Sequence, residues 1–340
     1  MKKNRLSNIE LLRIIAMMMI VLLHMNYYSL GVVDAHLIDN NPFEAYVRMQ
    51  FQQFCVCAVN VFVLISGWFG IKYSMKGVFS ILFQFFFWGV GVLLFSTIMG
   101  RNITLHDWRS VFNINDSYWF IIAYIFLFLL APSLNRFVEL ENKKVIAEVI
   151  VIFFLLEFLF GWQDKGQFLF GYSTISFCGL YLLARIYKLY INPKISNMEG
   201  FKYRKALFLS GFFLFSVIPV IIGFWGRSIL DYDFVPLSYT SPFVILASSC
   251  LLLFFSEIEL KSSLINWCGC SVLSIYLFHL HPVVIPYLKD NMFFLYAHNN
   301  GYMYIFFCLV ITTIISFLCI LLDKVRIFFW NKIIEKTNYL

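Results

Sequence analysis

The sequence predicts an all-α membrane protein, a polytopic bundle of about ten transmembrane helices. The chain of 340 residues is 61% hydrophobic and only 13% charged, and its mean hydropathy is +0.79. A soluble domain has about 25% charged residues, so this composition excludes a soluble protein and a nucleic-acid binder. About ten helices of about 20 residues would use roughly 200 positions, which is close to the hydrophobic fraction. The apolar runs are also continuous, as from Ile81 to Met99, whereas the strands of a membrane β-barrel alternate with period two.

The predicted helices follow one another along the chain as apolar runs, separated by connectors that carry the charges and turn formers. DAHLIDNNP follows the first run, for example, and NPKISNMEG follows the sixth. We find no internal repeat and no polar stretch long enough for a soluble domain, so residues 1–340 are expected to form one membrane domain. The predicted spans are 8–28, 50–71, 78–99, 117–134, 145–161, 168–187, 206–226, 236–256, 267–287 and 302–322.

The basic residues predict how this bundle is oriented. An even number of spans places both termini on one side, and the segments on that side hold 19 of the 26 basic residues. The opposite side holds 6, and Arg13 lies within the first span. Because cytoplasmic segments carry the excess of Lys and Arg, both termini are predicted to be cytoplasmic, in the plasma (inner) membrane. The formal charge of +7 is therefore explained by topology and by attraction to anionic membrane lipid.

The first span is unusual because it contains Glu10, Arg13 and His24. A charge inside a span costs about 2.5–3.5 kcal/mol on insertion scales, so it requires a partner or a function. Arg13 and His24 are eleven residues apart, which places them within ~20° of one helix face and ~16.5 Å apart along it. Glu10 is three residues before Arg13 and can pair with it. On spacing alone, a plain ion pair near the interface with a histidine at the far end is an equal alternative to a catalytic role.

Four segments, in order, resemble a known family. The first is the arginine, ten residues and histidine of IELLRIIAMMMIVLLHM. VNVFVLISGWFGIK (59–72) resembles the family's second helix, SYWFIIAYIFLFLLAP (117–132) a middle helix, and SVLSIYLFHLHP (271–282) the signature near the family's end. The chain is thereby identified as a member of the acyltransferase-3 family of bacterial-type integral-membrane O-acyltransferases.

The resemblance implies a reaction and a donor site. The donor is expected to be a cytosolic acyl-CoA, usually acetyl-CoA, used as a co-substrate with no tightly bound cofactor. Arg13 would meet its phosphates, and His24 would act as general base or as a transient acyl carrier. Many members carry Arg-x-x-Arg where the third helix leaves the cytoplasmic face, but this chain has only Lys72 and Lys76 there. Lysine attracts phosphate without arginine's bidentate fork, so these two are either donor-binding residues or ordinary positive-inside lysines.

Four further residues are candidates for support or acceptor binding. His279 is expected in the same half of the bilayer as His24, with Tyr276 about one turn before it. His279 would orient His24 or touch the acceptor, or simply bond between helices. Tyr118 and Trp119 begin the fourth span and are either interfacial belt residues or a stacking surface for a sugar. Because His279 and His281 point ~200° apart on a helix, no metal site is expected.

The leading hypothesis is a membrane enzyme that moves an acetyl group from acetyl-CoA to a carbohydrate hydroxyl of a surface polysaccharide, lipopolysaccharide or exopolysaccharide. A transporter or flippase of lipid-linked sugar is the alternative, but the inverted repeats and broken helix pairs that would favour it are not evident. A third reading is an acyltransferase fold without activity, which the missing Arg-x-x-Arg keeps open. The expected partners are membrane lipid, acyl-CoA and a carbohydrate or lipid-linked glycan acceptor.

Overall fold

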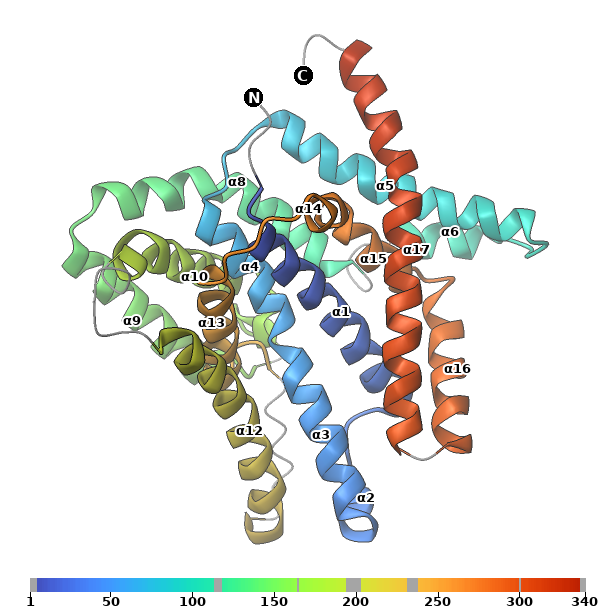
Figure 1. Ribbon diagram of the computed structural model, residues 1–340, viewed down its shortest axis with the longest axis horizontal. Coiled ribbons are helices and arrows are strands. Elements are labelled where there is room, and N and C mark those ends of the chain that lie inside the picture. Colours follow the sequence, from blue (N-terminus) through green and yellow to red (C-terminus); the bar gives the residue numbers. More distant parts are fainter. Residues whose placement is uncertain are drawn as a thin grey trace.

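The regular structure is entirely helical in the part of the chain that the computed structural model describes: residues 5–112, 118–163, 165–193, 203–230, 238–299 and 301–336 (Figure 1). The helices are α1 (Ser7–Leu30), α2 (Ala35–Asn40), α3 (Pro42–Val56), α4 (Ala58–Phe69), α5 (Met75–Ile98), α6 (Leu105–Phe112), α8 (Trp119–Leu140), α9 (Lys143–Phe160), η1 (Leu169–Gly171), α10 (Thr174–Ile186), η2 (Tyr187–Ile191), α12 (Arg204–Leu230), α13 (Pro242–Ser256), α14 (Ser263–Gly269), α15 (Val272–His279), α16 (Ile285–His298) and α17 (Gly301–Lys336).

Seven helices within the described ranges are long and apolar enough to cross a membrane. They are α1, α3 with α4, α5, α8, α10 with η2, α12 and α17. Two further apolar helices are shorter, α13 and the pair α14–α15. The predicted class, a helical membrane bundle, is confirmed.

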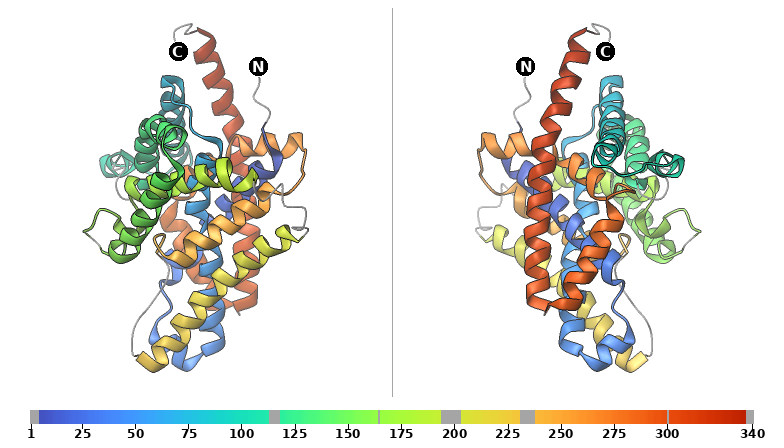
Figure 2. Two further views of the ribbon diagram at one scale, coloured as in Figure 1. Left: turned by 90° about the vertical axis from the view of Figure 1, so that its left-hand side faces the viewer. Right: turned by 90° about the vertical axis from the view of Figure 1, so that its right-hand side faces the viewer.

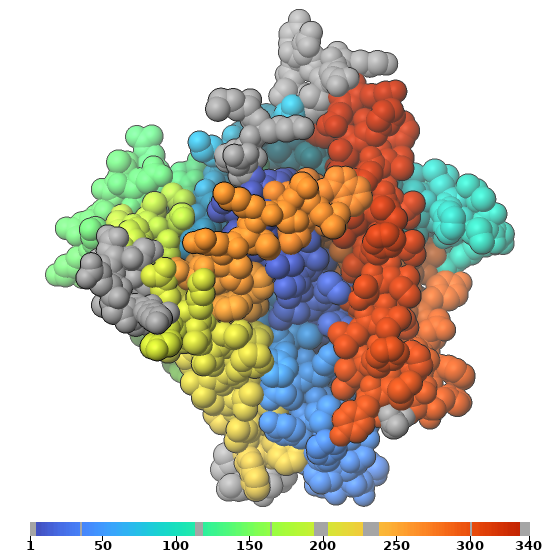
Figure 3. Space-filling model, viewed as in Figure 1, coloured from blue at the N-terminus to red at the C-terminus, as the bar shows by residue number. Residues whose placement is uncertain are grey.

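Helix α1 lies at the centre of this bundle. It packs against α3, α4 and each helix from α13 to α17, and in the space-filling view other helices cover much of it (Figure 3). Leu12, Ala16, Ile20 and Val21 are among its buried apolar residues. A helix that is apolar on most of its circumference has to be surrounded by others, and this burial fixes where Glu10, Arg13 and His24 lie.

The start of α1 and the end of α17 lie at the same end of the bundle, whereas α2 and the turn between α16 and α17 lie at the other end (Figures 1 and 2). This arrangement agrees with an even number of crossings. We refer below to the end with the start of α1 as the N-terminal end and to the other as the distal end.

The predicted ninth span, 267–287, is wrong as a single helix. Helix α14 ends at Gly269, α15 runs only from Val272 to His279, and α16 begins at Ile285. Proline lacks an N–H group and disfavours helical geometry in the residue before it, so Pro282 and Pro286 prevent the helix from continuing. As a result, His279 stands at the C-terminal end of a short buried helix.

The predicted starts of the sixth and eighth spans, 168 and 236, are also too early. Helix α10 begins at Thr174 and α13 begins at Pro242. Before α10, Phe170 and Gly171 have φ angles of 54° and 91°, which no helix continues. The Tyr239 N–H donates to the Phe170 carbonyl (3.2 Å), so the two segments that precede these helices are held together.

Candidate active site

The candidate site is built around two histidines from different helices. His24 on α1 and His279 at the end of α15 approach to 2.9 Å between Nδ1 of His24 and Nε2 of His279. Their rings meet edge to edge and are nearly parallel, with an interplanar angle of 27° and centroids 5.2 Å apart. His279 is 1% exposed, whereas His24 is half-buried and borders two small cavities. The structure therefore brings together two of the histidines that the sequence singled out.

The hydrogen bonds of this pair determine where its protons lie. Nδ1 of His279 is 2.7 Å from the Ile275 carbonyl, and a carbonyl can only accept, so this nitrogen carries a hydrogen. In a neutral imidazole the other nitrogen then has the lone pair. Nε2 of His279 therefore accepts from Nδ1 of His24. It follows that Nε2 of His24 has the free lone pair, which a base or a nucleophile requires.

The larger of the two cavities runs along the face of α1 on which the sequence places Arg13 and His24. It encloses about 40 Å³ and is lined on α1 by Met17, Ile20 and His24, spaced so that they continue the face of Arg13. Helices α4, α8 and α15 supply other walls. The smaller cavity, of about 10 Å³, is lined by both histidines together with Tyr28 and Lys289. His24 therefore separates two spaces.

Aromatic side chains form the wall of the larger cavity opposite α1. Trp119 lies against Tyr172 and Tyr239, at centroid distances of 4.6 and 6.2 Å. The Asn60 amide on α4 donates to the Tyr239 carbonyl (2.9 Å) and holds this segment in place. The sequence prediction named Trp119 but missed Tyr172 and Tyr239, because it placed both inside continuous helices. Asn60 lies in segment 59–72, and its structural role is to position Tyr239.

At the N-terminal end of α1, Glu10 holds the Arg13 side chain. Glu10 is 4% exposed, and its carboxylate pairs with Arg13 at 3.2 Å and with Arg5 at 3.1 Å. A Cβ atom added to Gly269 at the end of α14 would meet this carboxylate. The predicted Glu10–Arg13 pair is present, and a glycine in a helix remote in sequence makes room for it.

Of the remaining predicted residues, Tyr276 lies beside the histidines, whereas Tyr118, Lys72 and Lys76 do not line the cavity. The Tyr118 hydroxyl is buried and donates to the Leu277 carbonyl (3.0 Å), so it fastens α15 and does not face the cavity. Tyr276 lines the cavity, and its ring centroid is 6.1 Å from that of His279. Lys72 is exposed in the turn before α5, and Lys76 is exposed at the start of α5.

A buried arginine that the sequence prediction missed lies next to this turn. Arg185 on α10 is 8% exposed, packs its guanidinium against Gly70, and pairs with Glu139 at 3.5 Å. The Tyr181 hydroxyl accepts from the Ile71 N–H (2.8 Å) and donates to Asn135, so the turn before Lys72 is fixed by hydrogen bonds. In the sequence Arg185 stands among ordinary basic residues of the cytoplasmic flank, so only the fold distinguishes it.

His281 has a separate structural role, as its predicted direction implied. Its Nδ1 accepts from the Val283 N–H (3.2 Å), so its Nε2 carries the hydrogen that is donated to the Gly89 carbonyl on α5 (3.1 Å). Within the described ranges, no group of three or more His, Cys, Asp or Glu side chains could hold a metal ion.

Comparison with known proteins identifies the family. Residues 6–321 match the model of a family described as "Acyltransferase domain", the acyltransferase-3 family, which is nearly the whole chain. No curated protein and no solved structure gave a significant match. The matched region contains every helix up to α17 and both histidines of the site. The chain thus belongs to the acyltransferase-3 family and is a membrane acyltransferase.

Proposed function

We propose that the protein transfers an acetyl group from acetyl-CoA to a carbohydrate hydroxyl of a surface polysaccharide, lipopolysaccharide or exopolysaccharide. It would act in the plasma (inner) membrane with both termini in the cytoplasm. Acetyl-CoA would be a co-substrate, and no tightly bound cofactor is involved. The acceptor would be a carbohydrate or a lipid-linked glycan.

The observation that carries this proposal is the free lone pair on Nε2 of His24. Acyl transfer to a hydroxyl requires a group that removes the hydroxyl proton, and histidine is suited to this near neutral pH. Nε2 of His24 would accept that proton while the oxygen attacks the thioester carbon and the CoA thiolate leaves. In the alternative order, Nε2 attacks the thioester carbon and the CoA thiolate leaves. The hydroxyl oxygen then attacks the acyl carbon, and Nε2 leaves and takes up the hydroxyl proton, which finally passes to the thiolate. Both orders use the same nitrogen, and in both His279 orients the ring.

Arg13 supports entry of the donor from the cytoplasmic side. It lies ~16.5 Å from His24 along α1, a distance that the long pantetheine arm of CoA can span. Its guanidinium is held by Glu10 but is partly exposed, with 26% of the side chain accessible. We assign the CoA phosphates to Arg13. Lys72 and Lys76 are further exposed cations just before and at the start of α5, and α5 begins at the same end of the bundle as α1 (Figure 1).

The aromatic wall beside His24 supports a sugar as the acceptor. Trp119, Tyr172 and Tyr239 present ring faces and hydroxyl groups, which suit the mixed apolar and polar surface of a pyranose. A cavity of about 40 Å³ admits only a few water molecules. Binding of a sugar ring therefore requires these side chains to move apart.

The experiment is mass spectrometry of surface glycans from cells with and without the protein. We expect glycans heavier by one acetyl group only in cells that contain the protein, and loss of that group with His24→Ala at equal expression. His106→Ala, which removes an exposed histidine on α6, is the matched control and should acetylate normally. Glycans that are identical in all four strains would overturn the proposed function.

A further inference from the structure

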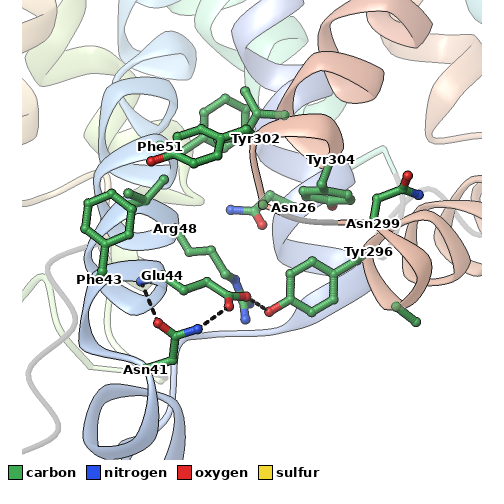
Figure 4. Close-up of a pocket in the computed structure, with 14 residues that line it drawn as sticks. Asn26, Asn41, Phe43, Glu44, Arg48, Phe51, Tyr296, Asn299, Tyr302 and Tyr304 are labelled. Carbon is green, nitrogen blue, oxygen red and sulfur yellow. Dashed lines mark hydrogen bonds between the residues drawn. The ribbon is translucent and has the colours of Figure 1, made fainter.

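A third cavity, of about 500 Å³, lies at the distal end of the bundle, between the end of α1, the start of α3, the end of α16 and the start of α17. It is far larger than either space beside His24. Figure 4 shows the side chains that line it, among them Asn26, Glu44, Arg48, Tyr296 and Tyr302. The proposed reaction at His24 uses none of these groups.

Asn26 is the first observation that points to a ligand. It is 1% exposed and lines the cavity from α1. Neither its amide nitrogen nor its amide oxygen has a hydrogen-bond partner among the described residues. A buried amide that lacks partners is unfavourable, above all within a membrane helix. Both amide atoms are covered in this conformation. A ligand that displaces the covering side chains and offers both a donor and an acceptor, as a hydroxyl group does, would satisfy Asn26.

The charges of the cavity favour a neutral ligand. Glu44 accepts hydrogen bonds from the Tyr296 hydroxyl and from Asn41. Arg48 donates to the carbonyls of Leu30 and Gly31 (3.2 and 3.3 Å), and its guanidinium lies 5.4 Å from the centre of the Tyr296 ring. The cavity holds one cation and one anion, and both have hydrogen-bond partners; only Nε of Arg48 lacks one among the described residues. The cavity therefore has no surplus charge for a phosphate or a carboxylate.

Two exposed aromatic rings line the cavity. Phe43 on α3 and Tyr302 on α17 are 62% and 68% exposed, and they contact each other with centroids 6.4 Å apart. Exposed rings above a polar interior match the two kinds of surface that a sugar has, its apolar C–H faces and its hydroxyl edge. A lipid chain would use the rings but leave the amide of Asn26 unsatisfied.

We infer that this cavity binds a neutral saccharide unit; its identification as part of the acceptor glycan rests on the proposed function. Asn26 follows His24 by two residues, so the two side chains point ~200° apart around α1. The saccharide is therefore held on a different flank of α1 from the acylation site. A glycan chain that reaches both sites would be bound at one saccharide unit in this cavity and acylated at another unit beside His24.

Binding can be tested apart from catalysis. The probe is the surface glycan isolated from cells that lack the protein, cut to oligosaccharides and titrated against the full-length protein in detergent, with saturation-transfer NMR as the readout. Glycerol phosphate, a lipid-headgroup anion, is the second probe. We expect saturable binding of the oligosaccharides and none of glycerol phosphate. No binding of the oligosaccharides by the wild type, or stronger binding of glycerol phosphate, would overturn the inference.

Variants separate a binding role from a structural one. Asn26→Leu keeps the size of the side chain and removes the unsatisfied amide, so it should weaken binding at least tenfold while thermal stability is kept or raised. Tyr302→Ala should also weaken binding, whereas Phe293→Ala, which removes a 58% exposed ring on α16 outside the cavity, should not. Lower stability of Asn26→Leu with unchanged binding would assign Asn26 a structural role and contradict the inference.

Transfer kinetics then connect the cavity to the acceptor. In membranes, Asn26→Leu should raise the KM for the oligosaccharide about tenfold, with kcat and the KM for acetyl-CoA unchanged. If the wild type binds the oligosaccharides but transfers nothing to them, the proposed function fails and the binding site stands. If the wild type transfers and Asn26→Leu leaves the acceptor KM unchanged, the proposed function stands and the link to the acceptor fails.

Discussion

At the scale of single residues, the site depends on one backbone carbonyl. The Ile275 carbonyl fixes the tautomer of His279, which in turn fixes that of His24. The carbonyl lies in a helix of eight residues that ends at His279. The orientation of the reactive nitrogen on α1 is therefore determined by the end of a different helix.

We predict that His279→Ala lowers kcat for acetyl transfer by roughly 10- to 100-fold, the usual effect of removing a group that orients a reactive histidine. Its loss frees the His24 ring to rotate and to exchange tautomers, while the donor site near Arg13 is untouched. The KM for acetyl-CoA should therefore stay the same.

The His279→Gln variant is the informative comparison with His279→Ala, because the amide oxygen of glutamine can still accept a hydrogen bond from Nδ1 of His24. Part of the lost rate should return with glutamine. Steady-state kinetics in membranes, with acetyl-CoA varied, measure both variants. Equal activity of the alanine and glutamine variants, or a raised donor KM with kcat unchanged, would contradict a positioning role for His279.

At the scale of helices, the close contact between α1 and α14 controls Arg13. Gly269 has no side chain, and this lets the buried Glu10 carboxylate lie against α14 while it pairs with Arg13. The Cβ of an alanine there would be 3.0 Å from the Glu10 Cβ and closer still to its carboxylate. The two helices or the ion pair would have to move.

We predict that Gly269→Ala destabilises the protein by about 1–3 kcal/mol through overpacking and raises the acetyl-CoA concentration needed for half-maximal transfer. Arg13→Lys, which keeps the charge and loses the planar fork, should raise that concentration too. Gly91→Ala is the control, because a Cβ at this position on α5 meets no atom within 4 Å. Thermal unfolding and donor titration report the two effects. A normal donor requirement in a destabilised Gly269→Ala protein would show that Glu10 does not control Arg13.

The sequence predicted some elements well and others poorly, for physical reasons. Apolar periodicity places α1 and the Arg13–His24 face correctly, because both depend on local spacing within one helix. It cannot show that His24 Nδ1 meets His279, since that contact joins residues 255 positions apart. Apolar periodicity also predicts continuous helices through Tyr172 and Tyr239, because their segments are apolar. The hydrogen bonds that shape these segments come from other parts of the chain.

At the scale of the whole molecule, the distribution of basic residues and the arrangement of the helices agree. The segments assigned to the cytoplasm contain most of the Lys and Arg residues, and the start of α1 lies at the same end as the end of α17 (Figure 2). The turn between α16 and α17 lies at the opposite end (Figure 1).

We predict that reporters fused after Lys261 and after Asn299 give opposite results. Lys261 follows α13 and lies on the predicted cytoplasmic side, whereas Asn299 precedes α17 at the distal end. A phosphatase that is active only outside the cytoplasm and a fluorescent protein that folds only inside it form a suitable pair of reporters. The same side for both positions would refute the topology.

The spaces beside His24 are narrow, and this affects how readily ions can leak across the membrane through the site. Cavities of about 40 and 10 Å³ on the two sides of this histidine hold few water molecules. If the acyl donor and the acceptor approach from opposite faces, the acyl group crosses at a constriction where hydrated ions find little room. Between reactions, while the side chains around His24 are closed, leakage of protons and sodium through the site is therefore expected to be low, which preserves the membrane potential.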